Sequence, residues 1–251
     1  MPLRFFLAVL IACASLLTAC GSDAESDRAP VVLAAASLQE ALEEAADAFA
    51  AAGNSRPTLS FAGTPAIARQ VQEGAPADLV ITADAQWMDE LESADLIDPA
   101  SRRDIAGNTL VLVAKPGEDG HLPEQPPLGP FLAMADPASV PAGRYAMAAL
   151  QSAGMWDAAE GRTTNSESVR AALALVERGE VPLGVVYRSD MLASGTVTQV
   201  LQFPDGSHPP IRYPAALLAS SENPAAADFL AFLASVEGQA IFEKHGFAPA
   251  P

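Results

Sequence analysis

The chain has 251 residues, and its 14 Lys and Arg against 31 Asp and Glu give a formal net charge of -17. This balance excludes a protein that grips nucleic acid or an anionic lipid surface through a broad face, because both require clustered basic side chains. Half of the residues are hydrophobic and only 18% are charged. The composition is therefore that of a globular protein with one large core or two smaller ones, not of a disordered acidic tail.

The N-terminal segment has the pattern of an export signal. Arg4 precedes an uncharged apolar stretch from Phe5 to Leu17, which has the length of a signal-peptide core and is too short for a stable membrane anchor. The stretch ends in LTAC, which resembles a bacterial lipobox, where cleavage precedes Cys20 and its thiol receives a lipid. We predict a signal peptide over 1–19 and a lipidated tether over 20–30. An ordinary cleavage site followed by an accidental cysteine is the alternative.

Cysteine usage is consistent with export without disulfides. The chain contains only Cys13 and Cys20, and Cys13 falls inside the predicted leader. The exported protein would keep a single thiol, so no disulfide is available within the chain.

From Pro30 onward, short apolar runs alternate with amphipathic helical stretches. The run VVLAAA from Val31 predicts a buried strand, and the spacing of Ser37 and Glu40 is that of a capping box that opens a helix ending at Gly53. A strand at Thr58–Ala62 is predicted next. It is followed by a helix that has Thr64 at its N-cap and Pro65 at its first position and that ends at Gly74. The last two elements of this set are a strand at Asp78–Thr82 and a helix at Gln86–Ala94.

A second set of elements begins at Gly107 and Asn108. The predicted strands are Leu110–Ala114, Phe131–Ala135, Leu183–Tyr187, Val197–Phe203 and Ile211–Leu218. The predicted helices are one from Val140 through Leu150, one opened by Ser166 and Glu167 that carries Val169, Leu173 and Val176, and two at Ala225–Ala234 and Val236–Lys244. The alternation favours an α/β fold. About ten strands and the break midway favour two sheets over one.

The usual marks of catalysis and of metal binding are missing from the sequence. His121, His208 and His245 are far apart, each near Pro or Gly, and are interpreted as surface residues. No HExxH, GxSxG, Walker loop or GxGxxG occurs. Asp89 and Glu92 are placed on a solvated helix face. We therefore predict no catalytic residue, no cofactor and no free metal cation.

Several predicted strands run directly into helices that begin with small or hydroxylic residues. These starts are Ser37, Thr64, Ala142 and the turn before Val169. A helix N-terminus presents unpaired N–H groups and a partial positive charge, so it can hold an anion without Lys or Arg. One such end is an ordinary helix start. Four ends at the carboxyl edges of two sheets predict an anion-binding cleft between lobes.

Seven sequence motifs together resemble the molybdate-binding proteins (ModA) of molybdate ABC transporters. They are VVLAAASL from Val31, APADL from Ala75, WMD from Trp87, Gly107-Asn108, VPAG from Val140, ALALVER from Ala172 and LGVVY from Leu183. The likeness runs in order from about Val31 to Phe247. It implies a two-lobed periplasmic-binding-protein fold with two mixed, mostly parallel sheets. Lobe I would comprise 31–106 and 204–251, and lobe II 107–203.

The resemblance also implies a set of ligand-binding residues. The family's two hydroxyl ligands fall on Ser37 and Thr64, its backbone N–H donors on Ala142 and Val169, and its phenol donor on Tyr187. The molybdenum would be bound as the oxyanion through these five residues.

Two positions depart from the family pattern. A Gly63-Thr64-Pro65 turn replaces the common Ser-rich turn, which keeps a hydroxyl but removes one nearby N–H. Arg188 follows the tyrosine where the family often has Gly, and we do not assign it to the oxyanion.

The predicted function is that of an extracytoplasmic lipoprotein that captures molybdate, and also tungstate, and delivers it to an ABC permease. It would be a monomer held by its N-terminal lipid in the periplasm or at the outer face of the cytoplasmic membrane, with no nucleic-acid partner. A protein of the same fold that binds sulfate or a small organic acid is one alternative. An enzyme on an α/β scaffold is a more remote one.

Overall fold

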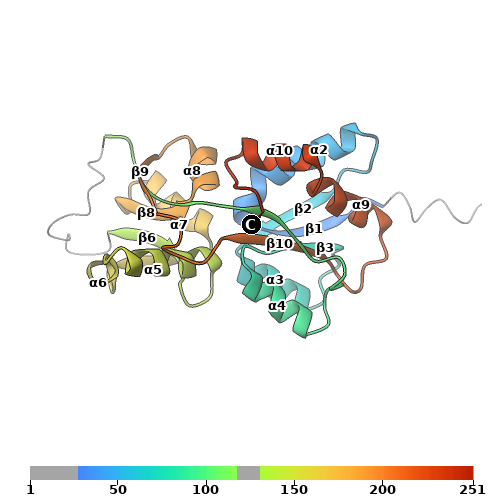
Figure 1. The fold of residues 1–251 in the computed structure, drawn as a ribbon, viewed down its shortest axis with the longest axis horizontal. Coiled ribbons are helices and arrows are strands. Elements are labelled where there is room, and N and C mark those ends of the chain that lie inside the picture. Colours follow the sequence, from blue (N-terminus) through green and yellow to red (C-terminus); the bar gives the residue numbers. More distant parts are fainter. Residues whose placement is uncertain (1–27, 118–130, 251) are drawn as a thin grey trace, which may run out of the picture.

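The computed structural model describes residues 28–117 and 131–250. The predicted signal peptide, the lipidation site Cys20, most of the tether and His121 lie outside the described residues. Within them, the chain forms two α/β halves side by side (Figure 1). We call these halves lobe I and lobe II and define each by its sheet and the helices packed on it.

Lobe I has a five-stranded mixed sheet in the order β2-β1-β3-β10-β4. Its strands are β1 (Val31–Ala35), β2 (Thr58–Ala62), β3 (Leu79–Ile81), β4 (Arg103–Gly107) and β10 (Arg212–Leu217). Its helices are η1 (Ala36–Leu38), α2 (Gln39–Ala51), α3 (Thr64–Gln72), α4 (Ala85–Ser93), α9 (Pro224–Leu233) and α10 (Val236–Lys244). β1 pairs in parallel with β2 and β3, whereas β10 runs antiparallel to β3 and β4.

Lobe II repeats this plan in the order β7-β6-β8-β5-β9. Its strands are β5 (Leu110–Ala114), β6 (Leu132–Ala135), β7 (Thr163–Ser166), β8 (Leu183–Tyr187) and β9 (Thr198–Gln202). Its helices are α5 (Pro141–Ser152), α6 (Trp156–Ala159), α7 (Val169–Glu177) and α8 (Arg188–Ser194). β6 pairs in parallel with β7 and β8, and β5 is antiparallel to β8 and β9. The predicted two-sheet α/β fold is confirmed, and the residue limits predicted for the lobes stay a prediction.

Alternating side chains place β1 between two helical layers. Val32 and Ala34 belong to the larger core, which includes α2 and α9, whereas Leu33 packs with Ile67 of α3 and Leu91 of α4. Figure 1 shows α3 and α4 on one side of this sheet and α2, α9 and α10 on the other. β1 is an inner strand that is buried on both faces, which explains why its sequence is continuously apolar.

Within residues 28–117 and 131–250, no single helix combines the length and apolar character needed to cross a membrane. Only α9 and α10 taken together have that length and composition, and they are bent by 60° at the break between them.

Three predicted helix starts are wrong in detail. Ser37 does not cap a helix, because it lies within the 3-10 helix η1, Leu38 is the N-cap of α2, and the Ser37 side chain bonds Tyr213 instead. Gly63, not Thr64, is the N-cap of α3, and Thr64 is its first residue. The predicted opening of a helix at Ser166 fails because this residue ends β7. Ser168 caps α7 and accepts a hydrogen bond from Ala171 N at 3.1 Å.

Four elements were not predicted: β4, β7, α6 and α8. β7 is an edge strand with the sequence TTNS, so it has no apolar alternation to mark it. α8 follows β8 with no loop between them and ends at Gly195, whose φ of 63° terminates the helix in the left-handed region.

Candidate functional site

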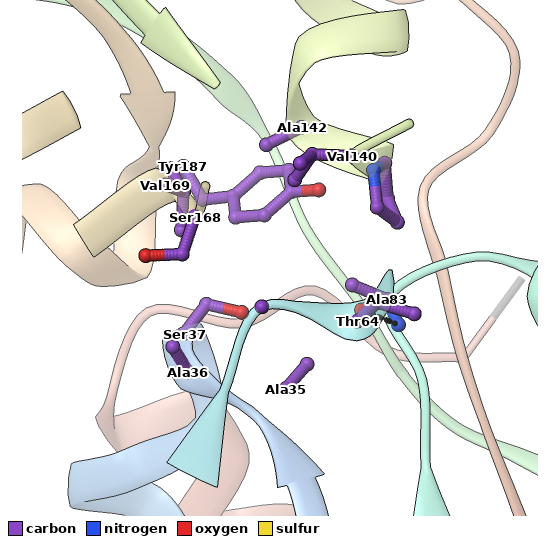
Figure 2. A pocket seen from close by; sticks show the side chains of 12 residues that line it. Ala35, Ala36, Ser37, Thr64, Ala83, Val140, Ala142, Ser168, Val169 and Tyr187 are labelled. Atoms are coloured by element: carbon purple, nitrogen blue, oxygen red, sulfur yellow. Dashed lines mark hydrogen bonds between the residues drawn. The ribbon is translucent and has the colours of Figure 1, made fainter. Parts of the chain in front are cut away.

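A small cavity opens between the two lobes, where several strands end and helices begin (Figure 2). Its enclosed volume of about 20 Å³ leaves space only for a small ligand. Its lining comes from both lobes and comprises Ala35, Ala36, Ser37, Gly63, Thr64, Ala83, Val140, Pro141, Ala142, Ser168, Val169 and Tyr187. Among these described residues no side chain is charged.

The first turns of η1, α3, α5 and α7 line the cavity. The N–H groups of a first helical turn have no partner inside the helix, and the helix dipole adds a partial positive charge there. Pro141 starts α5 and has no N–H, so Ala142 supplies the first amide donor of that helix. In α3, Thr64 keeps its N–H and Pro65 has none. The departure at Gly63-Thr64-Pro65 therefore removes the second amide of the turn and leaves the first.

Two hydroxyl groups on the lobe I side can donate into the cavity. Thr64 Oγ1 accepts a hydrogen bond from Ala83 N at 3.2 Å, which leaves its own proton available. Ser37 Oγ lies 3.0 Å from the hydroxyl of Tyr213. Both Ser37 and Thr64 are only 2% exposed. These hydroxyls lie opposite the phenol of Tyr187, which extends from lobe II (Figure 2).

The Tyr187 hydroxyl is buried and has no hydrogen-bond partner among the described residues. Burial, followed by the influence of nearby Tyr213, raises the pKa of Tyr187 well above its ordinary value, so the phenol keeps its proton and acts as a donor. A buried hydroxyl without a partner costs free energy, about 1–3 kcal/mol. A ligand with an acceptor atom at this point would remove that cost.

Carboxylates near the cavity are engaged by arginines and do not line it. Asp84 caps α4 and forms an ion pair with Arg144 of lobe II. Asp190, which is fully buried, accepts a hydrogen bond from Arg170. An anion in the cavity would therefore meet no negatively charged side chain of the lining, and a ligand that needs a carboxylate as acceptor would find none there.

The structure brings all five predicted site residues, Ser37, Thr64, Ala142, Val169 and Tyr187, around this one cavity. Ser168 and Val140 also line it and were not predicted as site residues. Ser168 could have been found from its position directly before the apolar period of α7, which is the usual N-cap signal.

Arg188 lies outside the cavity lining, and its guanidinium donates to the carbonyl of Gly246 at 3.3 Å. In the described ranges no group of three His, Cys, Asp or Glu side chains could hold a metal ion. Asp89 and Glu92 both bind Arg102 on the surface of lobe I.

Comparison with known proteins finds relatives over nearly the whole chain. Residues 30–248 match the family described as bacterial extracellular solute-binding protein. The molybdate-binding protein ModA of Escherichia coli is 40% identical and covers 95% of this chain and 96% of its own length. ModA of Haemophilus influenzae is 35% identical, over 95% and 97%. The periplasmic molybdate-binding protein of Azotobacter vinelandii superposes with a TM-score of 0.78 at 24% identity, covering 88% of this chain and all of that one.

Proposed function

Because the chain belongs to the ModA family within the bacterial extracellular solute-binding proteins, we propose that it binds molybdate in the interlobe cavity and delivers it to an ABC permease. The named relatives are binding proteins, which supports capture of a solute and not catalysis. The ligand-binding residues in this proposal are Ser37, Thr64, Ala142, Val169 and Tyr187.

The unpartnered Tyr187 hydroxyl is the observation that carries the proposal. A buried donor aimed at a cavity that is lined by hydroxyls and helix N-termini and by no carboxylate favours a ligand that accepts hydrogen bonds. A fully deprotonated tetrahedral oxyanion meets this condition, because each of its oxygens accepts hydrogen bonds. Hydrogen phosphate carries a proton near neutral pH, and no carboxylate lines the cavity to accept it.

We propose that closure of the two lobes signals to the permease that the ligand is bound. Hydroxyls of Ser37 and Thr64 come from lobe I, whereas the amides of Ala142 and Val169 and the Tyr187 phenol come from lobe II. An oxyanion can contact both sets only when the lobes are together, so its binding would favour the closed state. The permease would recognise that closed shape.

Tungstate forms the same tetrahedral dianion, so we include it among the ligands. The lipid on Cys20 would hold a monomeric protein in the periplasm or at the outer face of the cytoplasmic membrane. Metabolic labelling with a radioactive fatty acid should mark the full-length chain and not a Cys20→Ala variant. Label on both, or on neither, would contradict this anchor.

Calorimetric titration of the purified protein tests the ligand. We expect one molybdate per chain, competition by tungstate, and weak or no competition by sulfate and phosphate. Ser37→Ala should weaken molybdate binding about tenfold to a hundredfold, because it removes a charge-assisted hydrogen bond of about 1.5–3 kcal/mol. Ser194→Ala, which lies outside the cavity lining, is the control. Preferred binding of sulfate would instead support a different oxyanion carrier of the same fold.

A further inference from the structure

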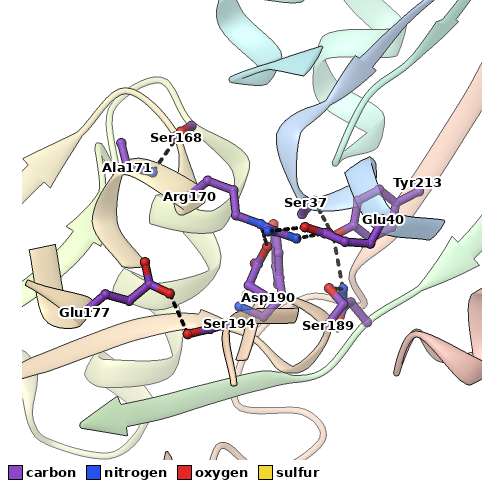
Figure 3. Close-up of polar contacts among 12 residues, drawn as sticks. Ser37, Glu40, Ser168, Arg170, Ala171, Glu177, Ser189, Asp190, Ser194 and Tyr213 are labelled. Carbon is purple, nitrogen blue, oxygen red and sulfur yellow. Dashed lines mark hydrogen bonds and ion pairs between the residues drawn. The ribbon is translucent and has the colours of Figure 1, made fainter. Parts of the chain in front are cut away.

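A chain of hydrogen bonds lies behind Ser37 and reaches into lobe II (Figure 3). Ser37 Oγ is 3.0 Å from Tyr213 Oη, and Asn108 Nδ2 lies 3.1 Å from the same phenol oxygen. Asn108 Nδ2 also donates to Ser189 Oγ at 2.9 Å. Asn108 follows the last strand residue of β4, Tyr213 is on β10 and Ser189 is on α8. Neither Asn108 nor Tyr213 lines the cavity.

The direction of this chain is determined at Asn108. Its Oδ1 accepts a hydrogen bond from Thr109 N at 2.8 Å, so the NH₂ end of the amide must face Tyr213. An amide NH₂ donates and does not accept, so the Tyr213 oxygen is the acceptor there. Among the described residues, Ser37 is then the one hydrogen-bond partner left for the single Tyr213 proton. Tyr213 is fully buried, and burial raises its pKa, so this proton stays on the phenol.

We propose that Asn108 and Tyr213 are positioning residues that force the Ser37 hydroxyl to donate into the cavity. The inference rests on the proposed function of oxyanion binding. With its oxygen accepting from Tyr213, Ser37 turns its own proton to the ligand. An unprotonated ligand oxygen accepts that proton. A ligand proton finds no acceptor in a Ser37 held in this way, so the relay disfavours hydrogen phosphate.

Tyr213 also has a packing role, and the test must separate the two. Its ring lies edge-on to Tyr187, with centroids 6.0 Å apart, and to Phe247 at 5.4 Å. Tyr213→Phe keeps these ring contacts and removes only the hydroxyl. Ser194→Ala removes a hydroxyl that bonds Glu177 within lobe II and does not line the cavity, and serves as the control.

A double-mutant cycle of Tyr213→Phe with Ser37→Ala measures the coupling. For molybdate, Tyr213→Phe alone should lower the affinity about threefold to tenfold, the effect of one hydrogen bond. In the Ser37→Ala background, Tyr213→Phe should lower the molybdate affinity less than about twofold, because the Ser37 hydroxyl that Tyr213 orients is already gone. Equal losses in both backgrounds would overturn the relay and leave Tyr213 a packing residue.

Asn108→Asp is the second variant, and it reverses the relay without changing side-chain shape. The carboxylate still accepts from Thr109 N, but it cannot donate to Tyr213. The phenol would turn its proton to the carboxylate and accept from Ser37, which would then face the oxyanion with a lone pair. We expect at least about a tenfold loss of molybdate affinity. In the Tyr213→Phe background, Asn108→Asp should lower the molybdate affinity less, because only the effect of the added charge remains. A loss as large as that in the wild-type background would contradict the proposal.

Wild-type titration separates a failure of the relay from a failure of the proposed function. If the wild type binds molybdate and neither cycle shows coupling, the relay alone is wrong. If the wild type binds sulfate instead, the same cycles are measured with sulfate and decide the relay in the same way. If it binds no oxyanion, both proposals fall. Thermal unfolding establishes which variants are folded. If the variants of one cycle do not fold, the other cycle decides the outcome. The ratio of molybdate to phosphate affinity should also fall in Tyr213→Phe and not in Ser194→Ala.

Discussion

Arg170 of α7 holds Glu40 of α2 across the boundary between the lobes, with Nη1 donating to Glu40 Oε1 at 2.8 Å and Nη2 bound to the second carboxylate oxygen (Figure 3). The same guanidinium donates through Nε to Asp190 within lobe II. Burial opposes ionisation of Glu40, but the hydrogen bond and charge of Arg170 outweigh it and lower the Glu40 pKa. The pair therefore stabilises the closed arrangement in which the cavity is complete.

Glu40→Gln should weaken oxyanion binding although Glu40 does not line the cavity. Loss of the ionic contact makes closure less favourable, and a partly exposed pair of this kind contributes about 1 kcal/mol, so the molybdate affinity should fall about threefold to tenfold. Glu44→Gln is the matched control on the same helix, because Glu44 binds Lys244 and His245 inside lobe I. Equal effects of the two variants in calorimetry would contradict a role of Glu40 in closure.

Tyr187→Phe should separate binding from folding. Removal of a buried hydroxyl that has no partner in the described residues should leave the free energy of unfolding of the ligand-free protein unchanged or raise it by about 1 kcal/mol. The molybdate affinity should fall about tenfold or more, because the oxyanion loses a donor. Urea unfolding and calorimetry measure the two quantities. A destabilised ligand-free protein with unchanged affinity would show that the phenol serves the fold and not the ligand.

Much of the architecture could be predicted from local patterns. The bounds of β8 and α10 agree residue for residue with those expected, because one is a continuous apolar run and the other follows a Ser N-cap. Edge strand β7 has no apolar period, and its pairing with β6 depends on a neighbour distant in the chain. Helix starts were misplaced by one or two residues because several adjacent small or hydroxylic residues could each serve as the cap.

The site was predictable only in part for a related reason. Residues that follow strand ends could be placed near one another from the order of the elements alone. The groups behind them could not, since Ser37 and Tyr213 are 176 residues apart in the chain and Asn108 contacts Tyr213 over 105. A Tyr on an apolar strand is interpreted as a core residue until the position of its hydroxyl is known. Cross-lobe contacts such as Arg170 with Glu40 depend on tertiary structure and leave no local pattern.

Gly63→Ala should make closure less favourable without destabilising either lobe. Gly63 has a φ of -59°, which any residue can adopt, so the backbone is not strained by the change. The added Cβ, however, would collide with the carbonyl oxygen of Glu167 in lobe II. Overpacking costs about 1–3 kcal/mol, so the molybdate affinity should fall about fivefold to a hundredfold while the unfolding free energy of the ligand-free protein changes little.

Gly143→Ala is the comparison for this prediction, because its Cβ would collide with the carbonyl of Ala135 inside lobe II. This variant should lower the unfolding free energy itself. Small-angle scattering should show that Gly63→Ala closes only at molybdate concentrations about fivefold to a hundredfold higher than those that close the wild type. If Gly63→Ala closed normally and bound molybdate with wild-type affinity, the close approach of the lobes at this position would not be needed for binding.

Asp190 should make the stability of the protein depend on pH between about 4 and 6. Burial raises the Asp190 pKa from 3.8 to about 6, although Arg170 lowers it in part. In this window the folded protein takes up a proton that the unfolded chain does not, so the contribution of Asp190 to stability rises as the pH falls. The full change is about 3 kcal/mol for a shift of this size. Urea unfolding of the wild type and of Asp190→Asn from pH 4 to 7.5 should give a difference that favours the wild type increasingly toward acid pH. A difference independent of pH would mean that Arg170 keeps Asp190 ionised throughout this window.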